Sequence, residues 1–158
     1  MRKAINLILR LIVGGVFIFA GIVKIWNVQV KTAHQGHDIA ITVSASNVPD
    51  YGTFATDVTN YRVPPRALGN LVAITLPWIE VLAGALLVLG IWARPSALVI
   101  ACLMIVFLLA IGQAVTRGLN INCGCFGTVE GRKVGLIALA EDAVLLAMAA
   151  WLAWREQD

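Results

Sequence analysis

The sequence predicts an all-α integral membrane protein built as a four-transmembrane-helix bundle, and two observations carry that prediction. Apolar residues make up 59% of the 158 residues and charged residues only 13%, whereas a soluble domain is normally about one quarter charged. The apolar residues also gather into four long runs, each near the ~20 residues that a helix needs to cross about 30 Å of hydrocarbon. We therefore expect a single transmembrane domain over residues 1–158, with no separate soluble domain.

The first run covers residues 4–26 and follows Arg2 and Lys3, as the apolar part of a secretory signal would. It ends in Lys24-Ile25-Trp26, however, which is a cationic and aromatic anchor typical of a membrane interface. We therefore expect this run to remain as a transmembrane helix. The other three helices are expected at residues 71–93, 96–114 and 134–154.

The long loop of residues 27–70 is the sizeable segment expected outside the membrane. Apolar and aromatic side chains recur there at helical spacing, namely Tyr51, Phe54, Val58 and Tyr61. With Asp57 and other polar residues elsewhere on the turn, this spacing predicts a short amphipathic helix at the interface, over residues 51–62. Earlier in the loop, Ile39, Ile41 and Val43 alternate with small residues, which allows a short strand.

Charged residues occur within the predicted helices. Arg10 and Lys24 share one face of the first helix with Gly14, Phe17 and Gly21. Glu80 lies roughly 13 Å inside the second helix, at ~1.5 Å per residue, just after Pro77. Glu141 and Asp142 lie about one third of the way into the fourth. An ionised group at such depth costs at least ~2.5 kcal/mol, so we expect each to have a partner or a water-filled pocket.

Antiparallel connectivity places these groups on one side of the membrane, together with the long loop and the loop of residues 115–133. We expect Lys24 or Arg117 to pair with Glu80, Glu141 or Asp142. Such a polar pocket would support chemistry in the 115–133 loop; the alternative is a purely structural ion-pair network.

Two cysteines one residue apart, Cys123 and Cys125, lie in that second loop. A disulfide closed over a single glycine is strained, and strained exposed disulfides exchange readily, so the pair is a candidate redox-active dithiol. Two alternatives stay open: an inert structural bridge, or ligands of a metal site completed by His34 and His37. Histidines in a polar loop are usually only solvated, and we expect no metal. Cys102, within the third helix, is expected to be small apolar filling.

The distribution of basic residues barely separates the two sides of the membrane. Because disulfides persist outside the cytosol, we place the CGC loop on the extracytoplasmic side and both termini in the cytoplasm. The net charge of +3 is small and predicts no nucleic-acid partner.

The chain resembles the methylamine-utilisation MauE family, within the wider DoxX-like group of four-helix membrane proteins. The resemblance is carried by ordered short motifs: Arg10, Gly14, Phe17, Ala20-Gly21 and Lys24, then Tyr61-Arg62 with Pro64-Pro65, Leu76-Pro77 with Glu80 and Gly84, Leu89-Gly90, Arg94, Arg117-Gly118 and the run from Cys123 to Gly127. Two features depart from the family pattern. Residues 28–50 look like an insertion, and Glu141 stands where many relatives have arginine.

The resemblance implies a membrane thiol–disulfide oxidoreductase of the bacterial inner membrane. Its Cys123–Cys125 pair would exchange electrons with a thioredoxin-like or other disulfide-bearing extracytoplasmic protein, coupled to a membrane quinone. The family is also associated with maturation of a disulfide-rich dehydrogenase subunit. The alternative is a non-enzymatic accessory subunit or chaperone, with a structural CGC disulfide and a polar pocket that binds a lipid or a small ligand.

Overall fold

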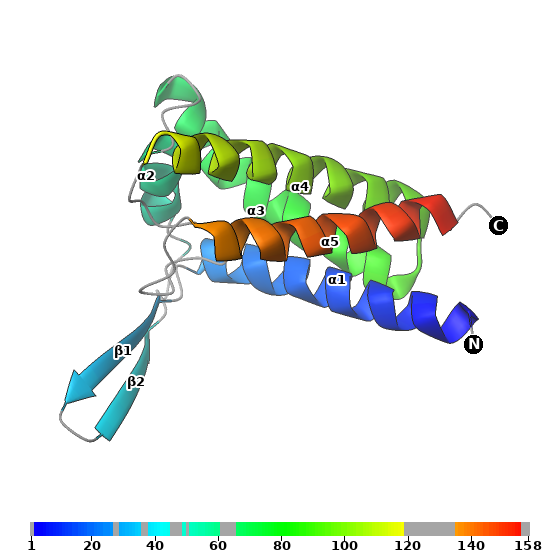
Figure 1. Cartoon of the computed structure of the whole chain (residues 1–158), viewed down its shortest axis with the longest axis horizontal. Helices are drawn as coiled ribbons and strands as arrows, with labels where there is room; N and C mark the ends of the chain where they lie inside the picture. Colours follow the sequence, from blue (N-terminus) through cyan, green and yellow to red (C-terminus); the bar gives the residue numbers. More distant parts are fainter. Residues whose placement is uncertain are drawn as a thin grey trace.

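Four long helices form the body of the molecule, seen here in a computed structural model (Figure 1). The structure describes residues 2–26, 29–35, 38–44, 49, 51–60, 66–118 and 135–155. The long helices are α1 (Arg2–Ile25), α3 (Arg66–Leu89), α4 (Ala93–Thr116) and α5 (Leu136–Arg155). Each contains an apolar stretch of 20 to 24 residues, long enough to cross a membrane. The predicted four-helix membrane fold is confirmed.

The helices pack in a ring, with α1 against α3, α3 against α4, α4 against α5, and α5 against α1. The chain termini lie at one end of the bundle (Figure 1). The opposite end carries a short helix, α2 (Gly52–Asn60), and a hairpin of β1 (Gln29–Gln35) and β2 (Asp38–Ser44).

Alanines are frequent in the interior of the bundle, between larger side chains such as Leu87, Ile100 and Leu152, and large apolar residues cover its outside. Alanines contribute much of the central core, among them Ala83, Ala97, Ala101 and Ala149. Bulky side chains such as Phe19, Leu82, Val106 and Leu109 are about 60% exposed. Such an arrangement suits lipid as the solvent, because close helix packing in membranes depends on small residues at the interfaces.

Glycines bring α1 and α3 into close contact. A Cβ atom at Gly84 would lie 2.7 Å from the carbonyl oxygen of Gly14, and one at Gly21 would lie 2.6 Å from that of Pro77. No side chain fits at either position without moving a backbone. Pro77 itself is buried within α3, which continues through it. The face of the first helix that Gly14 and Gly21 share is therefore the one that contacts α3.

The α3–α4 turn corrects one predicted boundary. The apolar run had suggested a helix to residue 93, but α3 ends at Leu89. Gly90 follows with φ of 72°, and Trp92 has φ of 55° at the start of α4. Glycine adopts this left-handed backbone without strain and commonly ends helices, whereas tryptophan there is strained. Hydrophobicity alone cannot reveal this turn, because Ile91 and Trp92 continue the apolar run.

The long loop contains both predicted kinds of structure. The predicted amphipathic helix is confirmed over Gly52–Asn60 as α2, and its residues 61 and 62 lie outside the described residues. α2 packs on α3, and just before α2 Tyr51 Oη accepts a 3.3 Å hydrogen bond from Trp78 Nε1. The alternating residues 39–43 do form a strand, β2, and it pairs antiparallel with β1 from Gln29↔Ser44 to Gln35↔Asp38. This hairpin projects away from the bundle (Figure 1) and adds a small β element to the expected helical fold.

Candidate functional site

A buried ion pair joins α1 to α3 towards the end of the bundle that carries α2. Lys24 Nζ donates a hydrogen bond to Glu80 Oε1 at 2.6 Å. The two side chains are 0% and 1% exposed. A lone charge in such a place would cost several kcal/mol, so each residue supplies the counter-charge that the other needs. Of the pairings that the sequence left open, that of Lys24 with Glu80 is confirmed.

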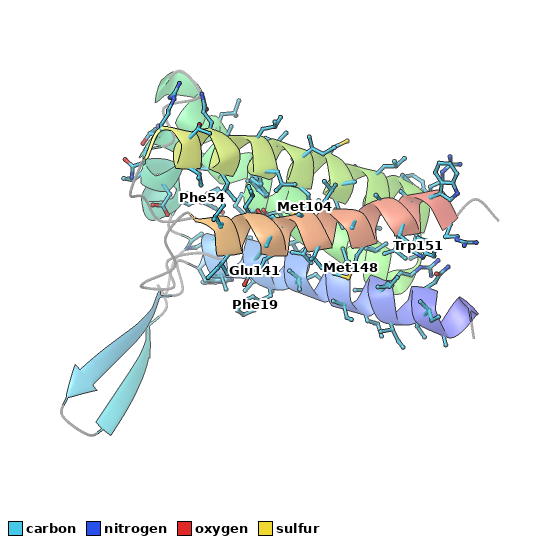
Figure 2. The ribbon with its side chains drawn as sticks, in the orientation of Figure 1. Phe19, Phe54, Met104, Glu141, Met148 and Trp151 are labelled. Atoms are coloured by element: carbon cyan, nitrogen blue, oxygen red, sulfur yellow. The ribbon has the colours of Figure 1, made fainter. Side chains whose placement is uncertain are left out.

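Two phenylalanine rings complete the surroundings of the ammonium group. Lys24 Nζ lies 5.1 Å from the ring centroid of Phe54 and 5.2 Å from that of Phe107. Both distances are within the ~6 Å over which an aromatic ring attracts a cation. Phe54 comes from α2 and Phe107 from α4, so α1, α2, α3 and α4 all meet at one ammonium group. Figure 2 shows Phe54 at the end of the bundle where α2 lies.

Glu80 also lines a small cavity between the four long helices, with a volume of about 10 Å³. Asp142, from α5, lines the same cavity and is 2% exposed. Met104, labelled in Figure 2, forms part of the apolar wall. The second carboxylate oxygen of Glu80, Oε2, is buried and accepts no hydrogen bond from the residues that the structure describes. Two carboxyl groups from different helices therefore border one internal space.

A further buried carboxyl group lies on α2. Asp57 is 8% exposed and follows Phe54 by three residues, so the two side chains share a helix face. Burial raises the pKa of Asp57 above its ordinary value of 3.8. The sequence pattern had placed Asp57 on the polar side of an interfacial helix. The structure corrects this, because α2 packs against the bundle with that face inward.

The other predicted pocket residues lie elsewhere. Arg117 is exposed just beyond α4, where its backbone N–H donates to the Gln113 carbonyl at 3.1 Å. Glu141 is half-buried beside Asp142, and each has a further interaction partner. The structure also corrects the expectation for Arg10. Its guanidinium group lies at Gly90, since a Cβ atom there would be 3.0 Å from Arg10 Nη1. That turn is at the opposite end of the bundle, because Arg10 precedes Lys24 by about four helical turns.

The proposed redox pair, Cys123 and Cys125, lies outside the described residues. The two helices that flank it are described: α4 ends at Thr116 and α5 begins at Leu136. Both of these helix ends lie at the α2 end of the bundle (Figure 1). Cys102 is exposed on α4, so it faces the surroundings of the bundle and does not fill its core.

The two histidines give no described site. His37 lies outside the described residues, and His34 is in β1, where its backbone is paired with Ile39. The side chains of that strand are outside the description as well, so the metal alternative stays a sequence-based expectation.

A second, larger space opens between α3 and α4. It has a volume of about 250 Å³ and is lined mainly by apolar side chains, including Ala83, Leu86 and Val99. Trp92 and Pro95 also line it, so it extends towards the α3–α4 turn, away from α2. No sequence signal pointed to this groove, because its residues look like ordinary lipid-facing positions.

The chain matches the family described as methylamine utilisation protein MauE over residues 2–155. It belongs to the MauE family. This confirms the resemblance carried by the short motifs, and a match over nearly all of the chain includes both the buried ion pair and the segment with the cysteine pair. Family membership and four helices able to span a membrane together identify a multi-pass membrane protein.

Three relatives are each named methylamine utilization protein MauE. The protein of Methylorubrum extorquens is 36% identical over 98 residues, which are 61% of this chain and 53% of the relative. That of Paracoccus denitrificans is 36% identical over 93 residues, 58% of this chain and 50% of the relative. That of Paracoccus versutus is 37% identical over 109 residues, which are 68% of this chain and 59% of the relative. The chain thus spans little more than half the length of these relatives. No solved structure matches it significantly.

Proposed function

We propose that this MauE-family protein is a membrane thiol–disulfide oxidoreductase whose reactive groups are Cys123 and Cys125. In the oxidising direction, a thiolate of the partner protein attacks the Cys123 sulfur, and Cys125 leaves as a thiolate. The second partner thiolate then attacks the mixed disulfide, so the partner gains a disulfide and Cys123 leaves as a thiolate. Two electrons and two protons pass to the cysteine pair. The reducing direction uses the same bonds in reverse.

One observation carries this proposal: the cysteine pair is connected to the bundle at its polar end. The segment with both cysteines joins α4 to α5, and these helices meet it at the end that carries α2 and the Lys24–Glu80 pair. Arg117, exposed at the start of this segment, is a cation near the thiols in sequence. Positive charge near a cysteine favours its thiolate, which is the nucleophile in disulfide exchange.

The partner we propose is a thioredoxin-like or other disulfide-bearing protein outside the cytoplasm, because disulfides persist there. The names of the relatives extend the proposal to the context of methylamine utilisation, where this chain would act as a bacterial inner-membrane accessory protein. A membrane quinone is the electron acceptor that we propose, and it would be reduced to the quinol as the cysteine disulfide re-forms.

The decisive experiment compares three serine variants in the native membrane, with a thioredoxin-like protein as the substrate. Cys123→Ser and Cys125→Ser are expected to abolish exchange, at least 100-fold below the unmodified protein, while the amount of inserted protein stays the same. Cys102→Ser is the matched control, since that thiol is exposed on α4 and takes no part in the proposed reaction. We expect full activity from it.

Full activity in either the Cys123 or the Cys125 variant would refute the proposal. A structural disulfide in an accessory subunit would then explain the pair, and that alternative makes its own prediction. A structural bridge resists mild reductant, whereas an exchange site is reduced by it. A titration with dithiothreitol, followed by labelling of free thiols, separates the two.

A further inference from the structure

The unused oxygen of Glu80 is an unusual feature inside a membrane bundle. Glu80 is 1% exposed, and Lys24 occupies only Oε1. The second oxygen, Oε2, accepts no hydrogen bond from any residue within the described ranges. A buried acceptor on a charged group loses its hydration and, without a partner, gains nothing in return, so it destabilises the fold. Natural structures rarely keep such an atom unless water or a ligand reaches it.

The cavity beside Glu80 has the size and the lining that one water molecule needs. Its volume is about 10 Å³, close to the lower limit of ~10–15 Å³ for a single water. Two carboxyl groups border it, Glu80 from α3 and Asp142 from α5, and the rest of the wall is apolar. A water in such a space has polar groups on two sides, which meets the minimum of two partners for a buried water.

We propose that one water molecule in this cavity links Glu80 Oε2 to the Asp142 carboxyl group, and that the linked carboxyl groups bind and release a proton within the membrane. The water donates one hydrogen bond to Glu80 Oε2 and meets Asp142 with its remaining donor or lone pairs. A proton that enters is held by the two carboxyl groups through this water, and no other atom is gained or lost. Ionisable groups facing the interior of a membrane bundle commonly serve proton or ion pathways.

The side chains that face the site are charged or titratable on α1, α2, α3 and α5 and apolar on α4. On α1 the nearest cation is Lys24, which pairs with Glu80 Oε1. On α2 the buried Asp57 lies one helical turn from Phe54. α4 contributes the apolar side chains of Met104 and Phe107 to the cavity wall, and α5 contributes Asp142, with Glu141 beside it. The proton-binding site formed by Glu80 and Asp142 does not involve the cysteine pair. A failure of the proposed thiol chemistry would therefore not contradict this site.

The water is tested by filling its cavity without changing any charge. Ala20 lines the cavity and is 6% exposed, so the two extra methyl groups of Ala20→Val would occupy the space of the water. Ala83, also 6% exposed, lines the larger groove between α3 and α4, where the same methyl groups fit. Ala83→Val is therefore the matched control. Infrared spectra in nanodiscs are compared in ordinary water and in water labelled with ¹⁸O.

We expect a band of buried water in the unmodified protein and in Ala83→Val, shifted by ¹⁸O, and its loss in Ala20→Val. A band that is absent from the unmodified protein, or unchanged in Ala20→Val, overturns the proposal.

The proton is tested separately, by infrared difference spectra between acid and alkaline pH. We expect a carboxyl band that is lost in Glu80→Gln and shifted in Asp142→Asn, because the linked groups respond to each other. Asp57→Asn is the control, since that buried carboxyl group lies outside the cavity lining and its loss leaves the band in place. A band that survives Glu80→Gln, or one that Asp142→Asn leaves unshifted, overturns the proton-binding site even if the variants of Ala20 cannot be purified.

Discussion

Two cations on the same helix have opposite surroundings in this protein. Lys24, near the C-terminal end of α1, is 2% exposed and is enclosed by a carboxylate and two aromatic rings. Arg10, roughly 21 Å away along the helix at ~1.5 Å per residue, is half-buried and lies at the Gly90 turn. Arg10 and Lys24 both lie on the face of α1 that contacts α3, but only Lys24 is buried inside the bundle.

The difference shows that the cost of a charge in a membrane helix depends on what covers the charged group, and not only on its distance from the helix end. A long side chain near a helix end can reach the interface and keep its charged group hydrated. Arg10 lies eight residues inside α1, but its side chain reaches the turn that joins α3 to α4. Lys24 has α2 packed over it and can reach no solvent past Phe54, so it depends on partners from the protein. The charged group that is buried, that of Lys24, is therefore at the end of the bundle that carries α2.

The largest expected effect comes from removing the carboxylate that pairs with Lys24. Glu80→Ala leaves a buried cation without its counter-charge, and breaking a buried pair in this way typically destabilises a protein by about 3–5 kcal/mol. Denaturant unfolding in detergent micelles, followed by circular dichroism, measures the loss. The double variant Lys24→Met with Glu80→Met removes both charges and should recover most of the stability. If the double variant were no more stable than Glu80→Ala, the burial of an unpaired Lys24 charge would not explain the loss of stability.

Much of this site could be predicted from the sequence, because depth in a helix follows from counting residues. Four apolar runs predicted the spans. Antiparallel connectivity predicted that Lys24 or Arg117 would pair with one of three carboxyl groups, and the Lys24–Glu80 pair is one of those combinations. The two rings around Lys24 escaped prediction because an aromatic residue in a membrane helix, such as Phe107, looks like ordinary apolar filling. Arg10 was grouped with Lys24 by helix face alone, although their separation of 14 residues in the sequence already places the two side chains far apart along the helix axis.

The loop elements were predicted less completely, for a different reason. The alternation at residues 39–43 indicated a strand, but β1 contains few apolar residues and gave no such signal. Its pairing with β2 depends on backbone hydrogen bonds, which side-chain patterns do not report. The burial of Asp57 also could not be predicted from the sequence. It arises from the packing of α2 on the bundle and not from the polarity of the side chain.

A medium effect is expected from the rings that surround Lys24. Phe54→Leu and Phe107→Leu keep apolar bulk but remove the ring face, which costs about 0.5–2 kcal/mol for a cation–π contact. Phe19→Leu is the matched control, because Phe19 is 58% exposed on α1 and lies on the outside of the bundle (Figure 2). Each substitution is repeated in the Lys24→Met background, where no cation faces the rings. If the cost of Phe54→Leu were the same in both backgrounds, packing alone would account for it.

The smallest expected effect, and the one that is specific to pH, concerns Asp57. Burial raises the pKa of Asp57 in the folded protein above its ordinary value of 3.8. The folded state therefore holds this proton more tightly than the unfolded state does, and stability falls as the pH rises from about 3.8 through the raised pKa of the folded protein. Asp57→Asn removes that penalty without removing the polar side chain. We expect the variant to be more stable than the unmodified protein at neutral pH, with the advantage disappearing below a pH of about 3.8. Thermal unfolding of both proteins across this pH range measures the difference in their stability. If the stability advantage of Asp57→Asn grew on acidification, ionised Asp57 would instead stabilise the α2 end.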